Sequence, residues 1–364
     1  MYNYSSLFLI IFALLKIKDY ENQYFISISF LSFSITAQIT YIPDSIFEQK
    51  LINLGYDNIH DGSVATDSIN SIDSLDISSV SSIYKIYDLS GIEDFYNLQY
   101  LNCSNNHFPT LNLNNNSNLK HIICTSDSIE TLQVDYLFSL QTLVCNFNLL
   151  DSLDLSGNPG LTNLNCLRNE LTTLDLSNNT FLATVSCGEN QITTLDLSLL
   201  NLESLQCQNN PISSINLQNN YSLKHLTCHD NLLQSIDLSD NINLEWLSIG
   251  NGNLISPTFN NNLNTLDLSN NCNITNFYCS ANMNLTCIQV CDLTQTTNWA
   301  PLDSQQYFST DCNYSEVDET EAKKGKLIAV KDIFGREVNN IKQHEVLFYI
   351  FENNRVEKRI LLDN

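Results

Sequence analysis

Residues 161–179 read LTNLNCLRNELTTLDLSNN, a unit in which apolar side chains recur in two short groups. Apolar and polar residues alternate in each group, as L-N-C over 164–166 and as L-D-L over 174–176. Such alternation turns one set of side chains inward and the other outward, as a strand requires. An asparagine follows three residues after each group, at Asn169 and Asn179, where its amide can satisfy backbone groups at a turn.

The same unit recurs along the chain with a period of 21 residues, shortened once to 20. Its cysteine position is held by Cys103, Cys124, Cys145, Cys166, Cys187, Cys207 and Cys228, then by Ile249 and Cys279. The L-D-L group is clearest at 153–155, 174–176 and 266–268, whereas Leu137 and Leu200 replace the asparagine that follows it. A single unit cannot bury its own apolar face, so the period predicts a stack of coils that share one core.

These residues resemble the leucine-rich-repeat family, in particular the 21-residue, Bacteroidetes-type bacterial class in which both halves of the repeat are L-x-L-like. The resemblance covers about residues 70–290. It implies a β-rich solenoid, a right-handed coil with parallel strands on both sides and little helix. It also implies an N-terminal cap with the first repeats at 38–97, the solenoid proper at 98–290 and a C-terminal cap at 291–312.

The chain contains 12 cysteines, most of them at the repeat position. Stacked strands lie about 4.8 Å apart, close enough for disulfides, but parallel Cβ vectors disfavour the dihedral that a disulfide needs. Buried cysteine also serves as a small apolar side chain. We therefore expect buried thiols, with a metal-binding ladder or disulfides as the alternatives. For the cap, the family resemblance implies a Cys287–Cys312 disulfide, while Cys272 and Cys291 have no clear role.

The N-terminal segment predicts export followed by a cap helix. Its apolar runs, 7–15 and 24–35, are shorter than the roughly 20 residues of a membrane span. Residues 1–37 are interpreted as a signal peptide cleaved after Ala37, with an uncleaved anchor as the alternative. A capping box with Ser45 at the N-cap and Glu48 three residues later then predicts a short helix, which ends at Gly55.

The C-terminal segment has a different pattern. After a linker at 313–326, residues 327–364 read as strands joined by turns, with Asn353-Asn354 at a hairpin tip. This segment resembles the C-terminal sorting domain of the type IX secretion system, chiefly through the stretches at 332–337, 347–350 and 356–360. The resemblance implies that the secretion machinery recognises the tail. A generic β appendage is the alternative.

Charge and motifs exclude several classes of function. The formal net charge is −24, from 40 Asp and Glu against 16 Lys and Arg, which disfavours nucleic acid as a partner. No G-x-S-x-G, H-E-x-x-H, P-loop or G-x-G-x-x-G motif is present in the sequence. The sequence therefore predicts a protein that is not an enzyme and that needs neither a metal nor another cofactor.

Two features are candidate binding sites. The first is the outward aspartate of the L-D-L groups, at Asp154, Asp175, Asp196, Asp237 and Asp267. Neighbouring carboxylates at strand spacing repel by roughly 1 kcal/mol even in water. We call these five residues the aspartate file. One interpretation is a solvated face on which nearby serines reduce the repulsion between the carboxylates, and recruitment of Ca²⁺ or a cationic partner is the other.

The second candidate is an irregular stretch. The step from the cysteine position to the next L-x-L group is 8 residues from Cys103 to Leu111, but 17 from Ile249 to Leu266. Insertions in repeat proteins often bind ligands, which makes Asn253 and Phe259 candidate binding residues. A decayed half-repeat is the alternative.

Together these features predict a secreted or outer-membrane-attached binding module. We expect an adhesin-like scaffold that holds a protein or glycan ligand on the solenoid surface and has no stable membrane span. The alternative is a structural component of the cell envelope or matrix that self-associates.

Overall fold

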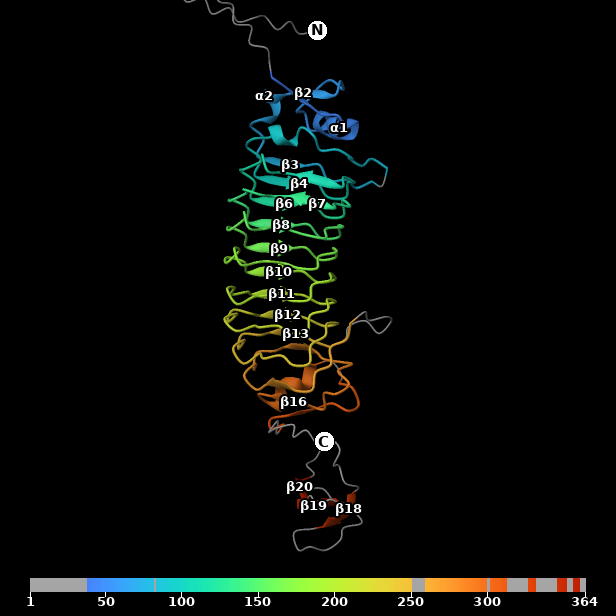
Figure 1. The fold of residues 1–364 in the computed structure, drawn as a ribbon, viewed down its shortest axis with the longest axis vertical. Helices are drawn as coiled ribbons and strands as arrows, with labels where there is room; N and C mark the ends of the chain where they lie inside the picture. Colours follow the sequence, from blue (N-terminus) through green and yellow to red (C-terminus); the bar gives the residue numbers. More distant parts are fainter. Residues whose placement is uncertain are drawn as a thin grey trace, which may run out of the picture.

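The chain folds into a long solenoid whose coils stack along one axis (Figure 1). The computed structural model describes residues 38–81, 83–250, 259–299 and 302–312, and the backbone of three further strands after residue 326. The expected signal peptide (1–37) and linker (313–326) lie outside the described residues, as does the expected turn at Asn353-Asn354.

One strand from each coil joins a 10-stranded parallel sheet. Each strand contains a buried central residue between two outward residues, and the cysteine position follows directly. The register is constant from coil to coil, with Leu164 opposite Leu143 on one side and Val185 on the other. In sheet order, the strands are β3 (Ser74–Asp76), β4 (Tyr100–Asn102), β6 (His121–Ile123), β8 (Thr142–Val144), β9 (Asn163–Asn165), β10 (Thr184–Ser186), β11 (Ser204–Gln206), β12 (His225–Thr227), β13 (Trp246–Ser248) and β15 (Asn276–Tyr278).

The opposite side of each coil contains fewer strands than the family resemblance implied. Regular strands occur there only near the two ends of the described solenoid, at β5 (Thr110–Asn112), β7 (Thr131–Gln133), β14 (Leu266–Leu268), β16 (Cys287–Val290) and β17 (Tyr307–Ser309). In the middle coils most of the L-D-L leucines are buried as expected. On this side the Leu155 carbonyl accepts hydrogen bonds from the Asn158 N–H and from the Asn179 amide of the next coil, so asparagine side chains join neighbouring coils.

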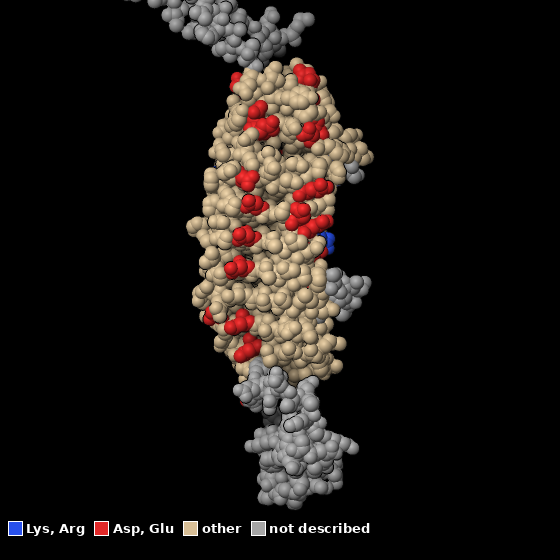
Figure 2. Space-filling view, in the orientation of Figure 1, with Lys and Arg blue, Asp and Glu red and all other residues tan. Residues whose placement is uncertain are grey.

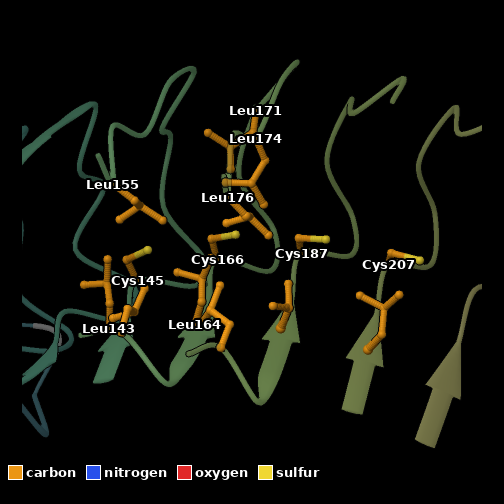
Figure 3. Packing of buried hydrophobic residues seen from close by; sticks show 14 of the residues in the cluster. Leu143, Cys145, Leu155, Leu164, Cys166, Leu171, Leu174, Leu176, Cys187 and Cys207 are labelled. Carbon is orange, nitrogen blue, oxygen red and sulfur yellow. The ribbon is translucent and has the colours of Figure 1, made fainter. Parts of the chain in front are cut away.

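The cysteine ladder is confirmed as a row of buried thiols. Eight cysteines at the repeat position, from Cys103 to Cys279, are unpaired and buried. Figure 3 shows Cys145, Cys166, Cys187 and Cys207 at equivalent places in successive coils, with their sulfur atoms on the same side and leucines around them. Cysteine fits this position because it fills a small apolar space without a polar group that needs a partner.

A ladder of buried asparagines holds the turn after each sheet strand. Asn190 is typical: its amide donates to the carbonyls of Cys166 and Cys187 at 3.0 Å, and its Oδ1 accepts the Leu171 N–H at 3.0 Å. The side chain thereby satisfies groups that the bend leaves without backbone partners. Equivalent bonds are made by Asn106, Asn148, Asn169, Asn210, Asn231, Asn261 and Asn282.

The N-terminal cap contains the predicted helix, α1 (Ser45–Asn53), but the capping box was wrong. The N-cap is Asp44, whose Oδ1 accepts the N–H groups of Ile46 and Phe47 at 2.9 Å. Glu48 points inward instead of back to the cap, and its Oε1 accepts the Gly62 N–H at 2.6 Å. The other cap elements are β1 (Ile39–Tyr41), β2 (Ser63–Ala65), α2 (Thr66–Ile69) and the 3-10 turn η1 (Ile92–Asp94).

The C-terminal cap closes the solenoid with a small parallel sheet, an aromatic cluster and two disulfides. β14, β16 and β17 pair in that order, and η2 (Leu293–Asn298) lies between the last two along the chain. Trp299 packs against Phe277 and Phe308, with ring centroids 4.7 and 5.3 Å away. The disulfides join Cys287 to Cys312 and Cys272 to Cys291.

The three strands after residue 326 form a separate antiparallel sheet in the order β18 (Leu327–Lys331), β19 (Val346–Phe351) and β20 (Val356–Ile360).

Candidate binding surfaces

The aspartate file lies on the outside of the solenoid, where acidic side chains form a row along the face seen in Figure 2. Every member has the same local structure, in which one carboxylate oxygen accepts the N–H of the serine two residues later. For Asp175 and Ser177 this distance is 2.9 Å. The same turn is made by Asp154, Asp196, Asp237 and Asp267.

These hydrogen bonds lower the pKa of Asp154, Asp175, Asp196 and Asp237. The pKa of Asp175 is lowered because the Ser177 backbone N–H and hydroxyl both donate to its carboxylate, and this outweighs repulsion from Asp154 and Asp196. The serines therefore offset the crowding of like charges, as the solvated-face interpretation expects. Among the described residues, no three His, Cys, Asp or Glu side chains come together as a group that could hold a metal.

The outward face of the ten-stranded sheet has the opposite character. From β4 to β15, neither outward position of any strand is Asp, Glu, Lys or Arg, although the chain has a net charge of −24. The outward residues are mostly Asn, Ser, Thr and Gln, with a few aromatic and aliphatic ones. At the C-terminal end of this face Trp246 and Tyr278 lie together, with ring centroids 5.3 Å apart.

The turn that follows the sheet strands forms one edge of the solenoid. The residue before every ladder asparagine except Asn261 has a positive φ, for example 59° at Phe147 and 56° at Arg168. Residues other than glycine rarely adopt a positive φ. Here the hydrogen bonds of the ladder asparagine hold the backbone in this conformation. Arg168 contacts the Phe147 ring, with 5.0 Å from guanidinium carbon to centroid, and pairs with Glu189 of the next coil.

The insertion falls in the same kind of turn. Asn261 takes the ladder position of its coil, so the extra residues lie between Ile249 and that asparagine. Asn253 lies outside the described residues, whereas Phe259 is described and half-buried. Phe259 lines a groove of about 610 Å³ whose other walls are Asn148, Arg168, Asn169, Glu170, Glu189, Asn190, Gln191 and Asn209.

The turn that follows the L-D-L groups forms the opposite edge, and sequence reasoning overlooked it. Six large apolar side chains are exposed there, among them Phe181 at 71% and Phe138 at 64%. We call this row the turn strip; it consists of Tyr136, Phe138, Phe181, Leu199, Tyr221 and Ile242. The available signal was the appearance of these residues among the Asn, Gly and Ser of the other turns.

Comparison with known proteins supports the leucine-rich-repeat fold. No protein-family model and no curated protein matches the sequence. Among solved structures, the functional domain of InlJ from Listeria monocytogenes, described as including a cysteine ladder, has a TM-score of 0.63 and 30% sequence identity. The match covers 73% of this chain and 61% of that one, so the chain spans less than two thirds of the InlJ domain.

The leucine-rich-repeat protein LIC12759 from Leptospira interrogans has a TM-score of 0.52 at 20% identity, covering 66% of this chain and 62% of that one. The chain is thus a leucine-rich-repeat solenoid with a buried cysteine ladder. In the part of the chain that the structure describes, no helix is long and apolar enough to cross a membrane.

Proposed function

We propose that this leucine-rich-repeat solenoid is an exported, adhesin-like binding protein without enzymatic activity. Its ligand, a protein or a glycan, binds the outward face of the ten-stranded sheet. The observation that carries the proposal is that no strand from β4 to β15 has Asp, Glu, Lys or Arg at either outward position, although the chain is strongly acidic. Charged side chains only border this face, at Lys120, Glu203, Lys224 and Glu245, each one residue before a strand. Charged residues are depleted from the cores of protein interfaces, where their desolvation is costly.

The aromatic residues support the same surface. Trp246 and Tyr278 lie together at one end of this face, and Tyr100 occupies an outward position of β4 near the other end. Tyrosine and tryptophan dominate the energy of many interfaces because they combine a large apolar area with a polar tip. The neighbouring Asn, Ser, Thr and Gln side chains supply hydrogen bonds that orient a ligand.

Export is the other part of the proposal. It is supported by the signal-peptide pattern at 1–37 and by the resemblance of 327–364 to a type IX sorting domain, through which the secretion machinery would recognise the tail. Mass spectrometry of both ends of the protein from its native host tests this part. A chain that begins at Gln38, lacks the tail and lies outside the cell is expected. A chain that keeps both ends inside the cell contradicts it.

The sheet-face proposal is tested with two variants of the full chain and a control. Thr184→Glu places a carboxylate at the centre of the face on β10, and Trp246→Ala removes the aromatic anchor. Thr173→Glu, an identical change on the exposed far side of the coil, is the control. Ligands are first recovered with the unmodified chain from arrays of glycans and of cell-surface proteins.

We expect Thr184→Glu and Trp246→Ala to weaken binding of a recovered ligand at least about tenfold, and Thr173→Glu to leave it unchanged. Equal binding by all variants excludes the sheet face. Concentration-dependent assembly in sedimentation without ligand favours the structural, self-associating alternative. The caps at both ends of the solenoid argue against stacking of one chain upon another.

A further inference from the structure

We propose that the turn strip and the aspartate file together form a second docking surface, which binds a cationic amphipathic helix of a protein partner. The strip is apolar and exposed, and the file beside it is anionic. The two rows run parallel because both derive from one segment of each repeat. This surface is separate from the sheet face, and the inference does not depend on the ligand bound there.

The two rows approach each other at Leu199. Leu199 of the strip lines a small surface cavity of about 50 Å³ together with Asp175 and Asp196 of the file. Along the chain, each strip residue follows the outward position of an L-D-L group by three to six residues, as Phe181 follows Asp175. A ligand that covers Leu199 must therefore also come close to Asp175 and Asp196.

The exposure of the strip side chains to water is unfavourable in the free protein. Tyr136, Phe138, Phe181 and Leu199 are each more than 60% exposed. Exposed apolar rows rimmed by polar groups mark interaction sites in many proteins. Burial of each of these side chains would contribute roughly 25 cal/mol for every Å² removed from water.

The negative charges of the aspartate file favour a cationic partner. The hydrogen bonds from Ser177 and Ser198 lower the pKa of Asp175 and Asp196, so these two carboxylates are anionic at neutral pH. None of the salt bridges among the described residues involves a member of the file. An anionic membrane would be repelled, whereas lysine and arginine side chains would be attracted.

The geometry favours a helix over an extended peptide. From Tyr136 to Ile242 the strip crosses about five coil spacings, or roughly 24 Å at about 4.8 Å each. A helix of about 16 residues has that length, and it presents an apolar stripe directly beside a charged one. A strand sends alternate side chains to opposite faces, so it cannot cover two adjacent rows of different character in this way.

The test uses fluorescence anisotropy of a labelled synthetic peptide of about 18 leucines and lysines, titrated with the full chain. Its leucines form one helical stripe and its lysines flank that stripe. A peptide of the same composition in shuffled order, which cannot form the stripe, controls for nonspecific attraction to an acidic protein. Vesicles of neutral phospholipid test whether the strip binds lipid instead.

Two double variants test the two rows separately. Phe181→Ser with Leu199→Ser removes apolar area at exposed positions, and Leu232→Ser, at an exposed leucine away from the strip, is its control. Asp175→Asn with Asp196→Asn removes charge only. The turn survives this change because Asn216 already makes it, with its Oδ1 accepting the Gln218 N–H at 3.0 Å.

We expect the striped peptide to bind, the apolar double variant to raise its Kd roughly tenfold, and the charge variant to raise Kd roughly three- to tenfold at low salt. Leu232→Ser should bind as the unmodified chain does. Absence of binding, equal binding of the shuffled peptide, equal loss in the Leu232→Ser control, or binding of vesicles in place of the peptide would each overturn the proposal.

Discussion

Asp127 occupies a position of the asparagine ladder, and its Oδ1 accepts the Asn106 backbone N–H at 2.5 Å. Its second carboxyl oxygen is buried and makes no hydrogen bond within the described part of the chain. In the next coil, Asn148 uses its amide nitrogen to donate to the carbonyls of Cys124 and Cys145. An ionised carboxylate has no hydrogen to donate at this position, so the ladder favours the protonated acid.

The first prediction follows from the titration of Asp127. Burial raises its pKa from 3.8 to about 7, and the Asn106 N–H and the more distant Lys85 offset only part of this shift. The folded chain therefore holds a proton that the unfolded chain releases near pH 4. Stability from this group is complete below about pH 4 and is lost as the pH rises to about 7. Asp127→Asn should abolish this dependence and stabilise the protein at about pH 8 by roughly 2–4 kcal/mol.

The comparison is made by thermal unfolding of both proteins across this pH range. The difference in midpoint between Asp127→Asn and the unmodified chain should grow as the pH rises. The nearby thiols Cys103 and Cys124 stay neutral over this range because burial raises their pKa well above 9. A difference that is the same at every pH would show that Asp127 does not titrate in this range.

The second prediction concerns a buried carboxylate introduced at another position of the asparagine ladder. Asn190→Asp replaces an amide that donates to two buried carbonyls, so the new carboxylate loses both bonds. We expect destabilisation of roughly 2–5 kcal/mol at about pH 8, with partial recovery in acid, measured as unfolding midpoints. Asn178→Asp adds the same charge at an exposed turn position and should change the midpoint little. Equal effects of the two substitutions would contradict a ladder of buried amides.

The sequence predicted the features that packing repeats in every coil. The positions of Cys166 and Asn169 recur because each coil must fill the same space and satisfy the same turn. A period of 21 residues therefore identified the solenoid, the buried thiols and the asparagine ladder. The capping box was wrong for a reason that the local sequence does not contain. Asp44 and Ser45 are both good cap residues, and the choice depends on a distant contact, in which Asp44 Oδ2 accepts the Tyr87 N–H at 2.7 Å.

The surfaces were harder to predict because they depend on neighbours between coils. The aspartate file was visible since its residue type repeats. The turn strip was not, because Tyr136, Phe181 and Ile242 occupy slightly different turn positions and become one row only when the coils are stacked. The uncharged sheet face was readable from the residues around each buried strand centre. No single residue type repeats from coil to coil at the outward strand positions, so no motif marks this face in the sequence.

A third prediction concerns the eight buried thiols. Burial raises the pKa of Cys187 to about 12 and that of Cys145 well above 9, so the reactive thiolate is scarce as well as inaccessible. A thiol reagent at about pH 8 should therefore label no ladder cysteine in the folded protein. After denaturation without reductant, eight thiols per chain should react, while the four disulfide cysteines stay silent. Labelling of the folded chain would show that the coils open locally.

The last prediction tests the C-terminal cap. The Cys287–Cys312 disulfide closes a separation of 25 residues, for which loop entropy predicts a stabilisation of roughly 3 kcal/mol. Trp299 lies within this loop, is 8% exposed and packs against Phe277, and the only other tryptophan is Trp246. In a Trp246→Phe background, Cys312→Ser should shift the Trp299 emission to the red at a lower urea concentration than the parent. The ladder coils should unfold at a nearly unchanged midpoint by circular dichroism, because contacts in a solenoid are local.

Cys272→Ser breaks the other disulfide, whose separation of 19 residues predicts a similar stabilisation. If neither variant changes the Trp299 transition, the cap is held by its aromatic packing and not by the disulfides.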